Sequence, residues 1–63
     1  MTEEDFEKIS MMWMQIRNAA LMARGVCIYD GPPMDEETRK KHIIEFIETA
    51  RWALSHIEDK LSK

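Results

Sequence analysis

The chain has 63 residues, nine basic and twelve acidic side chains, a formal net charge of −3 and a single cysteine. A chain this short forms one small domain and cannot enclose a large active-site cavity, and its one cysteine excludes a disulfide within the chain. The acidic balance argues against a general binder of nucleic acid, which needs a clustered excess of basic side chains.

The first helix is predicted over residues 2–24, with Thr2 as its N-cap and Gly25 as its C-cap. Apolar residues recur along it at spacings of three and four, which predicts a seam against one neighbouring helix. The predicted seam consists of Phe6, Ile9, Trp13, Ile16, Ala20 and Ala23.

A second group of apolar residues lies off this seam. It comprises Met11, Met14, Leu21 and Met22. A lone hairpin needs only one buried stripe per helix, so the second group predicts an oligomer interface with another copy of the chain. The alternative is a surface for a foreign helix or protein, because methionine side chains adapt to varied partners.

Residues 25–34 are predicted to form a linker that turns at Asp30 and is stiffened by two consecutive prolines. Val26, Ile28 and Tyr29 are expected to pack over the helix ends. Cys27, between them, is interpreted as a small, buried, reduced hydrophobe and not as a nucleophile, because no orienting group accompanies it.

The second helix is predicted over residues 35–61, with Asp35 as its N-cap. Its apolar residues follow the a and d spacing of a coiled coil. The predicted seam consists of Ile43, Ile47, Ala50, Leu54, Ile57 and Leu61, with Phe46, Ala53 and Ile44 on its flanks. On this assignment Ile47→Asp would bury an unpartnered carboxylate and unfold the protein.

Residues 1–63 are therefore predicted to be one all-α domain, a two-helix antiparallel hairpin that assembles into a homo-oligomeric helical bundle. Self-association is expected because a single core of this size gives only about 3–5 kcal/mol of stability. No apolar run approaches the roughly 20 residues that span a bilayer. With no basic, apolar leader at its start, the chain is expected to be cytoplasmic and to have no membrane partner.

Candidate contact residues for a ligand or partner lie on the second helix and the linker. Trp52 is a large aromatic on an otherwise polar side, flanked by Arg51 and His56, so either a second subunit covers it or it contacts a ligand. The basic run of Arg39, Lys40 and Lys41 follows the linker that carries Tyr29. This run is either a solvated surface or a phosphate-binding cluster.

Other chemistries are not supported by the sequence. His42, Glu45 and Glu48 are spaced by three but point away from the predicted seam, so we expect no metal and no cofactor. A DNA-reading helix-turn-helix needs a short turn and a basic second helix, and neither is present, so duplex DNA is not an expected partner.

We therefore predict a non-enzymatic helical protein that binds stoichiometrically, as an oligomeric adaptor or inhibitor of a larger protein. As an alternative, the Arg51–Trp52 pair on a compact hairpin resembles phage-encoded hairpin proteins that sequester cyclic nucleotide messengers of bacterial defence systems. The resemblance covers this pair and the general architecture. It implies a pocket between subunits in which Tyr29 or Trp52 stacks on a base and phosphate meets basic side chains, namely Arg39, Lys40, Lys41 or Arg51.

Overall fold

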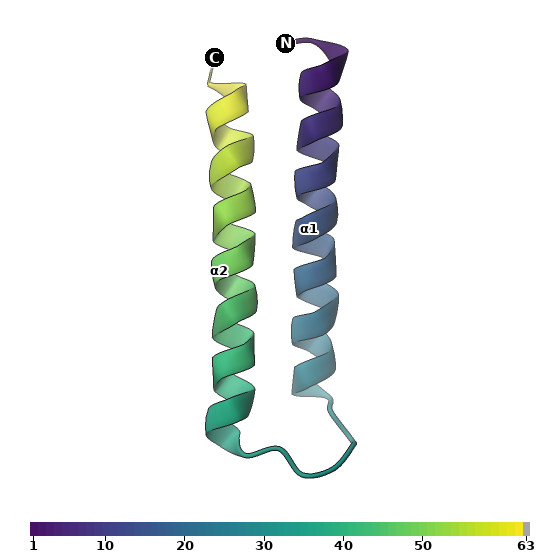
Figure 1. The fold of residues 1–63 in the computed structure, drawn as a ribbon, viewed down its shortest axis with the longest axis vertical. Coiled ribbons are helices and arrows are strands. Elements are labelled where there is room, and N and C mark those ends of the chain that lie inside the picture. Colours follow the sequence, from purple (N-terminus) through teal and green to yellow (C-terminus); the bar gives the residue numbers. More distant parts are fainter. Residues whose placement is uncertain (63) are drawn as a thin grey trace.

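The computed structural model describes residues 1–62 and forms an antiparallel hairpin of two long helices, α1 (Glu3–Cys27) and α2 (Glu36–Leu61) (Figure 1). Residues 28–35 connect them, and both termini lie at the end of the rod opposite this linker. The described residues contain no strand. The molecule measures 47 × 16 × 10 Å. The predicted all-α hairpin is confirmed.

Both predicted N-caps are formed. The Thr2 hydroxyl accepts a hydrogen bond from the backbone N–H of Asp5 at 3.2 Å, and the Asp5 carboxylate accepts one from the backbone N–H of Thr2 at 3.1 Å. Asp35 accepts from the backbone N–H of Thr38 at 2.8 Å. These bonds satisfy N–H groups that a helix start leaves without partners, so each helix begins where the sequence sets a cap.

The end of α1 differs from the prediction. Gly25 is not the C-cap, because α1 continues to Cys27, and the N–H of Ile28 donates to the carbonyl of Arg24 at 3.1 Å. The extra turn places Val26 half-buried beside α2, whereas Ile28 is exposed. Packing of Val26 outweighs the helix-breaking tendency of glycine, which is only about 1 kcal/mol.

The seam of α1 is displaced by one position from the predicted stripe. Ile9, Ile16 and Ala23 face α2 as expected, but Phe6, Trp13 and Ala20 are exposed. The residues that turn inward in their place are the ones immediately before them. The observed inward row is Asp5, Ile9, Met12, Ile16, Ala19, Ala23 and Val26.

The seam of α2 shows the same displacement. Ile43, Ala50 and Ile57 face α1 as predicted, whereas the other three members of the predicted stripe, Ile47, Leu54 and Leu61, are exposed. The observed inward row is Arg39, Ile43, Phe46, Ala50, Ala53, Ile57 and Lys60.

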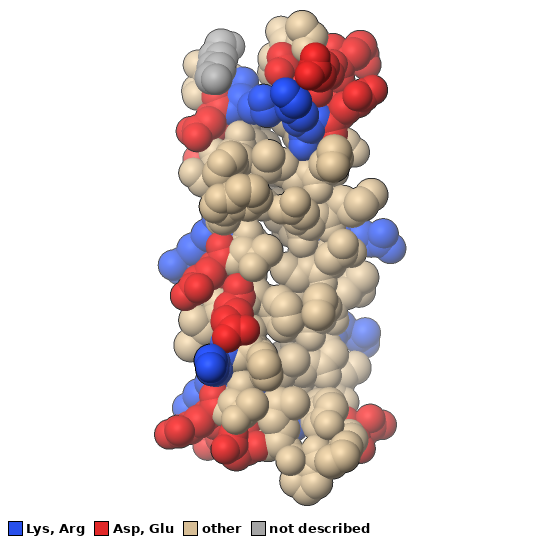
Figure 2. Space-filling view, in the orientation of Figure 1, with Lys and Arg blue, Asp and Glu red and all other residues tan. Residues whose placement is uncertain are grey.

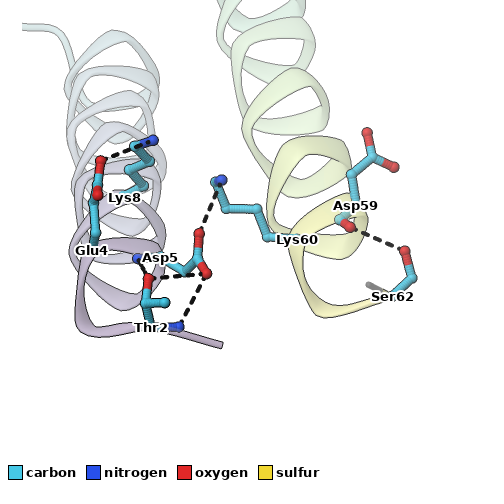
Figure 3. A network of polar contacts seen from close by, with 7 residues as sticks. All are labelled: Thr2, Glu4, Asp5, Lys8, Asp59, Lys60 and Ser62. Carbon is cyan, nitrogen blue, oxygen red and sulfur yellow. Dashed lines mark hydrogen bonds and ion pairs between the residues drawn. The ribbon is translucent and has the colours of Figure 1, made fainter.

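Small side chains allow the two helices to pack closely. The buried residues are Ile9, Ala19, Ala53 and Ile57, and Ala53 has no exposed surface at all. At the end that carries the termini, Lys60 of α2 reaches across to Asp5 of α1, with 3.6 Å between the Lys60 Nζ and Asp5 Oδ1 atoms (Figure 3). This polar pair lies at the end of the seam, with residue 5 level with residue 60.

Candidate functional site

Apolar side chains that the hairpin does not bury form two rows on one of its sides. Residues seven apart are close to two helical turns apart and share a face. Ala20 of α1 and Ile47 of α2 line one groove, which places their two rows on the same side. We call this side the Trp13 face. Its residues are Phe6, Trp13 and Ala20 of α1 and Ile47, Leu54 and Leu61 of α2.

The groove in the Trp13 face is a hollow of about 170 Å³. Its floor is formed by small seam residues, among them Ala19, Ala23 and Ala50, and its rims by Ala20 and Ile47. The hollow is almost entirely apolar because only alanine and larger aliphatic or aromatic side chains line it. It is suited to receive an apolar side chain and offers no polar group to orient a charged ligand.

The opposite side of the hairpin carries Met22. Ala20 and Met22 are two positions apart, about 200° around the helix, and so are Ile47 and Thr49 on α2. Met22 and Thr49 line a shared groove of about 250 Å³. We call this side the Met22 face. It carries Gln15, Met22 and Tyr29 from α1 and the linker, and His42, Thr49 and His56 from α2.

A second groove on the Met22 face, of about 350 Å³, lies where α1, the linker and α2 meet. Met22 and Tyr29 form one wall, and His42 and Phe46 the other. Met34 of the linker also lines it, a contact that the sequence pattern did not suggest. The groove is open to solvent, so it suits a side chain presented by a larger molecule more than an enclosed small ligand.

Trp52 and His56 are stacked on the Met22 side of α2. Their ring centroids are 4.2 Å apart with an interplanar angle of 39°. The Nδ1 atom of His56 lies 2.8 Å from the carbonyl oxygen of Trp52, so the tautomer protonated at Nδ1 donates a hydrogen bond there and leaves Nε2 free as an acceptor. Trp52 remains half exposed. The predicted contact residues Tyr29, Trp52 and His56 thus share one side with Met22.

Of the other predicted interface residues, Met14 and Leu21 lie on the outside of α1, whereas Met11 lies about three turns before Met22 on the same side as that residue. Met11, Met14 and Leu21 are all exposed, as is Met22. Going around α1 from the Trp13 face, the row that contains Arg17 precedes the row of Met14 and Leu21. A charged row therefore separates the methionine-rich surface from the Trp13 face. Figure 2 shows one broad side of the hairpin, with charged side chains at the ends and outer margins and uncharged ones between.

The predicted basic cluster disperses around α2. Arg39 is half-buried on the seam, and its Nε atom is buried without a hydrogen-bond partner among residues 1–62. Lys40 forms an ion pair with Glu36 at 3.1 Å, and Lys41 is exposed on the outer side. Consecutive helical residues diverge by about 100°, so these three cations do not converge on one phosphate within a single chain.

A reactive thiol, a metal site and a membrane-spanning helix are three further features to locate in the structure. Cys27 is exposed, contrary to the expectation that it would be buried. His42 lies 3.7 Å from Glu45, but within residues 1–62 no group of three His, Cys, Asp or Glu side chains lies close enough to hold a metal ion. Neither described helix is long and apolar enough to cross a membrane.

Within residues 1–62, the groups whose pKa values are shifted are the two capping carboxylates. Hydrogen bonding from the Thr2 backbone holds the pKa of Asp5 below 3.8, aided by the Thr2 hydroxyl and the Lys60 ammonium and opposed by partial desolvation. Hydrogen bonds from the side chain and backbone of Thr38 lower the pKa of Asp35 in the same way. Both shifts arise from helix capping.

The Trp13 face was not identified as a surface by sequence reasoning, because its residues were assigned to the interior. A seven-residue repeat is present on this face in both helices, but the seam has the same repeat, so the repeat does not separate the exposed row from the buried one. Compared with protein-family models, curated proteins and solved structures, the chain matches none.

Proposed function

We propose that the chain is a non-enzymatic helical binding protein that assembles with copies of itself and acts stoichiometrically, as an adaptor or inhibitor of a larger protein partner. The observation that carries this proposal is the open, mainly apolar groove on the Met22 face. It gathers Met22, Tyr29 and His42 at the junction of both helices and the linker. Such a surface accepts protruding side chains of another protein.

The chemistry of the Met22 face supports a protein partner. Methionine is flexible and polarizable, and aromatic side chains give large contact areas with little loss of conformational entropy. Trp52 and His56 add a stacked pair on the same side. The shifted pKa values belong to Asp5 and Asp35, which cap helices, so they serve the fold and not proton transfer.

Native mass spectrometry of the protein purified from its own cell tests the proposal. We expect an oligomer that retains a protein partner in a fixed ratio. Met22→Glu should reduce the retained partner at least tenfold, because it places a charge in the apolar groove. Ser55→Glu is the matched control, since Ser55 is exposed on the polar outer side of α2, and it should retain the partner.

Three outcomes would contradict the proposal. A strictly monomeric wild-type chain at micromolar concentration would refute the assembly. A small anionic nucleotide retained in place of a protein would refute the protein partner and favour messenger sequestration. A partner held equally well by wild type and Met22→Glu would show that binding does not use the Met22 face.

A further inference from the structure

The hairpin exposes more surface than a compact protein of the same mass. Its accessible surface is 5207 Å². A compact monomer of 7.5 kDa exposes about 4,250 Å², so the excess is about 950 Å². A stable two-protein interface buries about 800 Å² on each partner. The unburied surface of one chain is therefore sufficient for one interface of ordinary size.

The Trp13 face is the part of this surface that fits a second copy. It has a protrusion and a hollow on the same α1 row, because Trp13 is 51% exposed and the groove at Ala20 lies one heptad further along. Seven residues correspond to about 10 Å along the helix. A two-fold axis midway between the two positions, perpendicular to the helix, places Trp13 of each copy over the hollow of the other.

The same two-fold axis also brings the α2 row of one copy against the α2 row of the other. Ala20 is level with Ile47 in the groove, and in an antiparallel pair Trp13 is then level with Leu54. The axis that exchanges Trp13 and Ala20 thus also exchanges Leu54 and Ile47. In the resulting four-helix core the large Trp13 of one copy lies against the small Ala20 of the other, and Leu54 lies against Ile47, which has a similar volume. Pairing of large with small side chains fills close-packed cores.

Charge also favours this inverted arrangement. The first turn of α1 is acidic, with Glu3, Glu4 and Asp5. If two hairpins packed in the same direction, these carboxylates of both copies would gather at one end. In the inverted arrangement they lie at the linker end of the other copy, where Arg24, Lys40 and Lys41 offset the carboxylates of Asp35, Glu36 and Glu37 and the local charge is closer to neutral. Complementary charges orient associating surfaces, and like charges oppose the wrong orientation.

We propose that the Trp13 face binds a second copy of the chain in inverted orientation, with Trp13 of each copy seated in the alanine-floored hollow of the other. This inference rests on the self-assembly contained in the proposed function and specifies its face and direction. It leaves the Met22 face of both copies outside the dimer, available to the protein partner.

Disulfide trapping tests the direction of packing. In the inverted dimer Phe6 of one copy faces Cys27 of the other, so Phe6→Cys should give covalent dimers linked between position 6 and Cys27 under mild oxidation. Within one chain these positions are about 32 Å apart along α1, far beyond the roughly 7 Å limit for a disulfide. Peptide mapping identifies the linkage.

The double variant Phe6→Cys/Cys27→Ser is the matched control and should give no covalent dimer. A covalent dimer joined through two thiols at position 6 would show that the hairpins pack in the same direction and would overturn the inference. Absence of the 6-to-27 linkage in a chain shown to be dimeric would overturn it as well.

Sedimentation equilibrium tests whether the Trp13 face forms the dimer interface. Trp13→Asp should weaken the dimer at least about 30-fold while circular dichroism shows an intact hairpin, because a buried tryptophan anchor is lost from the interface. Met11→Asp, on the other side of α1, should remain dimeric. A dimer that dissociates with Met11→Asp, or that survives Trp13→Asp, would refute this face but leave the proposed assembly standing. A monomeric wild-type chain would refute both.

Discussion

The seam between the helices and the Trp13 face differ in the side chains that they carry near the middle of the rod. The seam has alanines at its centre, Ala19 and Ala53, which are buried, whereas the Trp13 face carries larger residues such as Trp13 and Leu54 that remain partly exposed. Small residues let two helices approach closely but bury little apolar area. The hairpin thus sets its geometry in the seam and leaves large apolar side chains on its surface.

The same charge placed in each region should have very different effects on folding. Ala53→Asp should unfold the hairpin, because Ala53 is 0% exposed and an unpaired carboxylate there has no solvent. Ile47→Asp should leave the helical circular dichroism of dilute protein intact, because Ile47 is 44% exposed. This corrects the expectation from the sequence that Ile47→Asp would unfold the chain.

Circular dichroism and thermal unfolding at low micromolar concentration measure both variants. We also expect Ile47→Asp to remove the concentration dependence of the melting temperature, since Ile47 lies on the Trp13 face. If Ala53→Asp melts like the wild type, the observed seam is wrong. If Ile47→Asp is unfolded when monomeric, the distinction between seam and face fails.

Acidification should weaken the seam through the helix caps. The folded-state pKa values of Asp5 and Asp35 are lower than 3.8, so both carboxylates favour the folded state at higher pH. Their contribution is complete above pH 3.8 and is lost as the pH falls through the lower folded-state values. Urea unfolding at pH 5, 4, 3 and 2 should show stability declining only below about pH 4.

Asp35→Asn provides the control for this titration, because asparagine caps helices as well as aspartate does but does not ionise. The variant should fold and should lose less stability than the wild type between pH 4 and pH 2. An identical decline in both proteins would mean that the Asp35 cap does not contribute to the acid response.

A substitution in the linker beside the Met22 face should have a smaller effect, on local structure and not on the stability of the hairpin. A Cβ atom added at Gly31 would lie 2.7 Å from the Tyr29 hydroxyl oxygen, so Gly31→Ala should displace the Tyr29 ring from its groove. The seam is untouched, and the melting temperature should change by no more than a few degrees. Nuclear magnetic resonance of the Tyr29 ring protons reports the displacement.

Gly25→Ala is the matched substitution, because a Cβ atom there meets nothing within 4 Å. It lies inside α1 and should stabilise the helix by about 0.5–1 kcal/mol. Unchanged Tyr29 resonances in Gly31→Ala, or a destabilised Gly25→Ala, would contradict the description of the linker and of the end of α1.

The elements themselves were predictable from local signals in the sequence. Thr2 and Asp35 mark the helix starts because their side chains satisfy nearby backbone N–H groups, which needs no knowledge of the rest of the fold. The prolines of the linker end helical order between the two apolar repeats. Among the candidate site residues, exposure of Trp52 also followed from its polar neighbours along one helix.

The tertiary structure alone decided which apolar stripe of each helix is buried. Neighbouring stripes differ by one position, about 100° around the helix, and both satisfy the same spacing rule. The choice depends on how two helices fit together at once. Ala19 and Ala53, buried at different levels of the seam, allow close packing, whereas Trp13 and Leu54 would hold the helices apart. Because that fit joins residues of two helices that are distant in the chain, no local pattern could specify it.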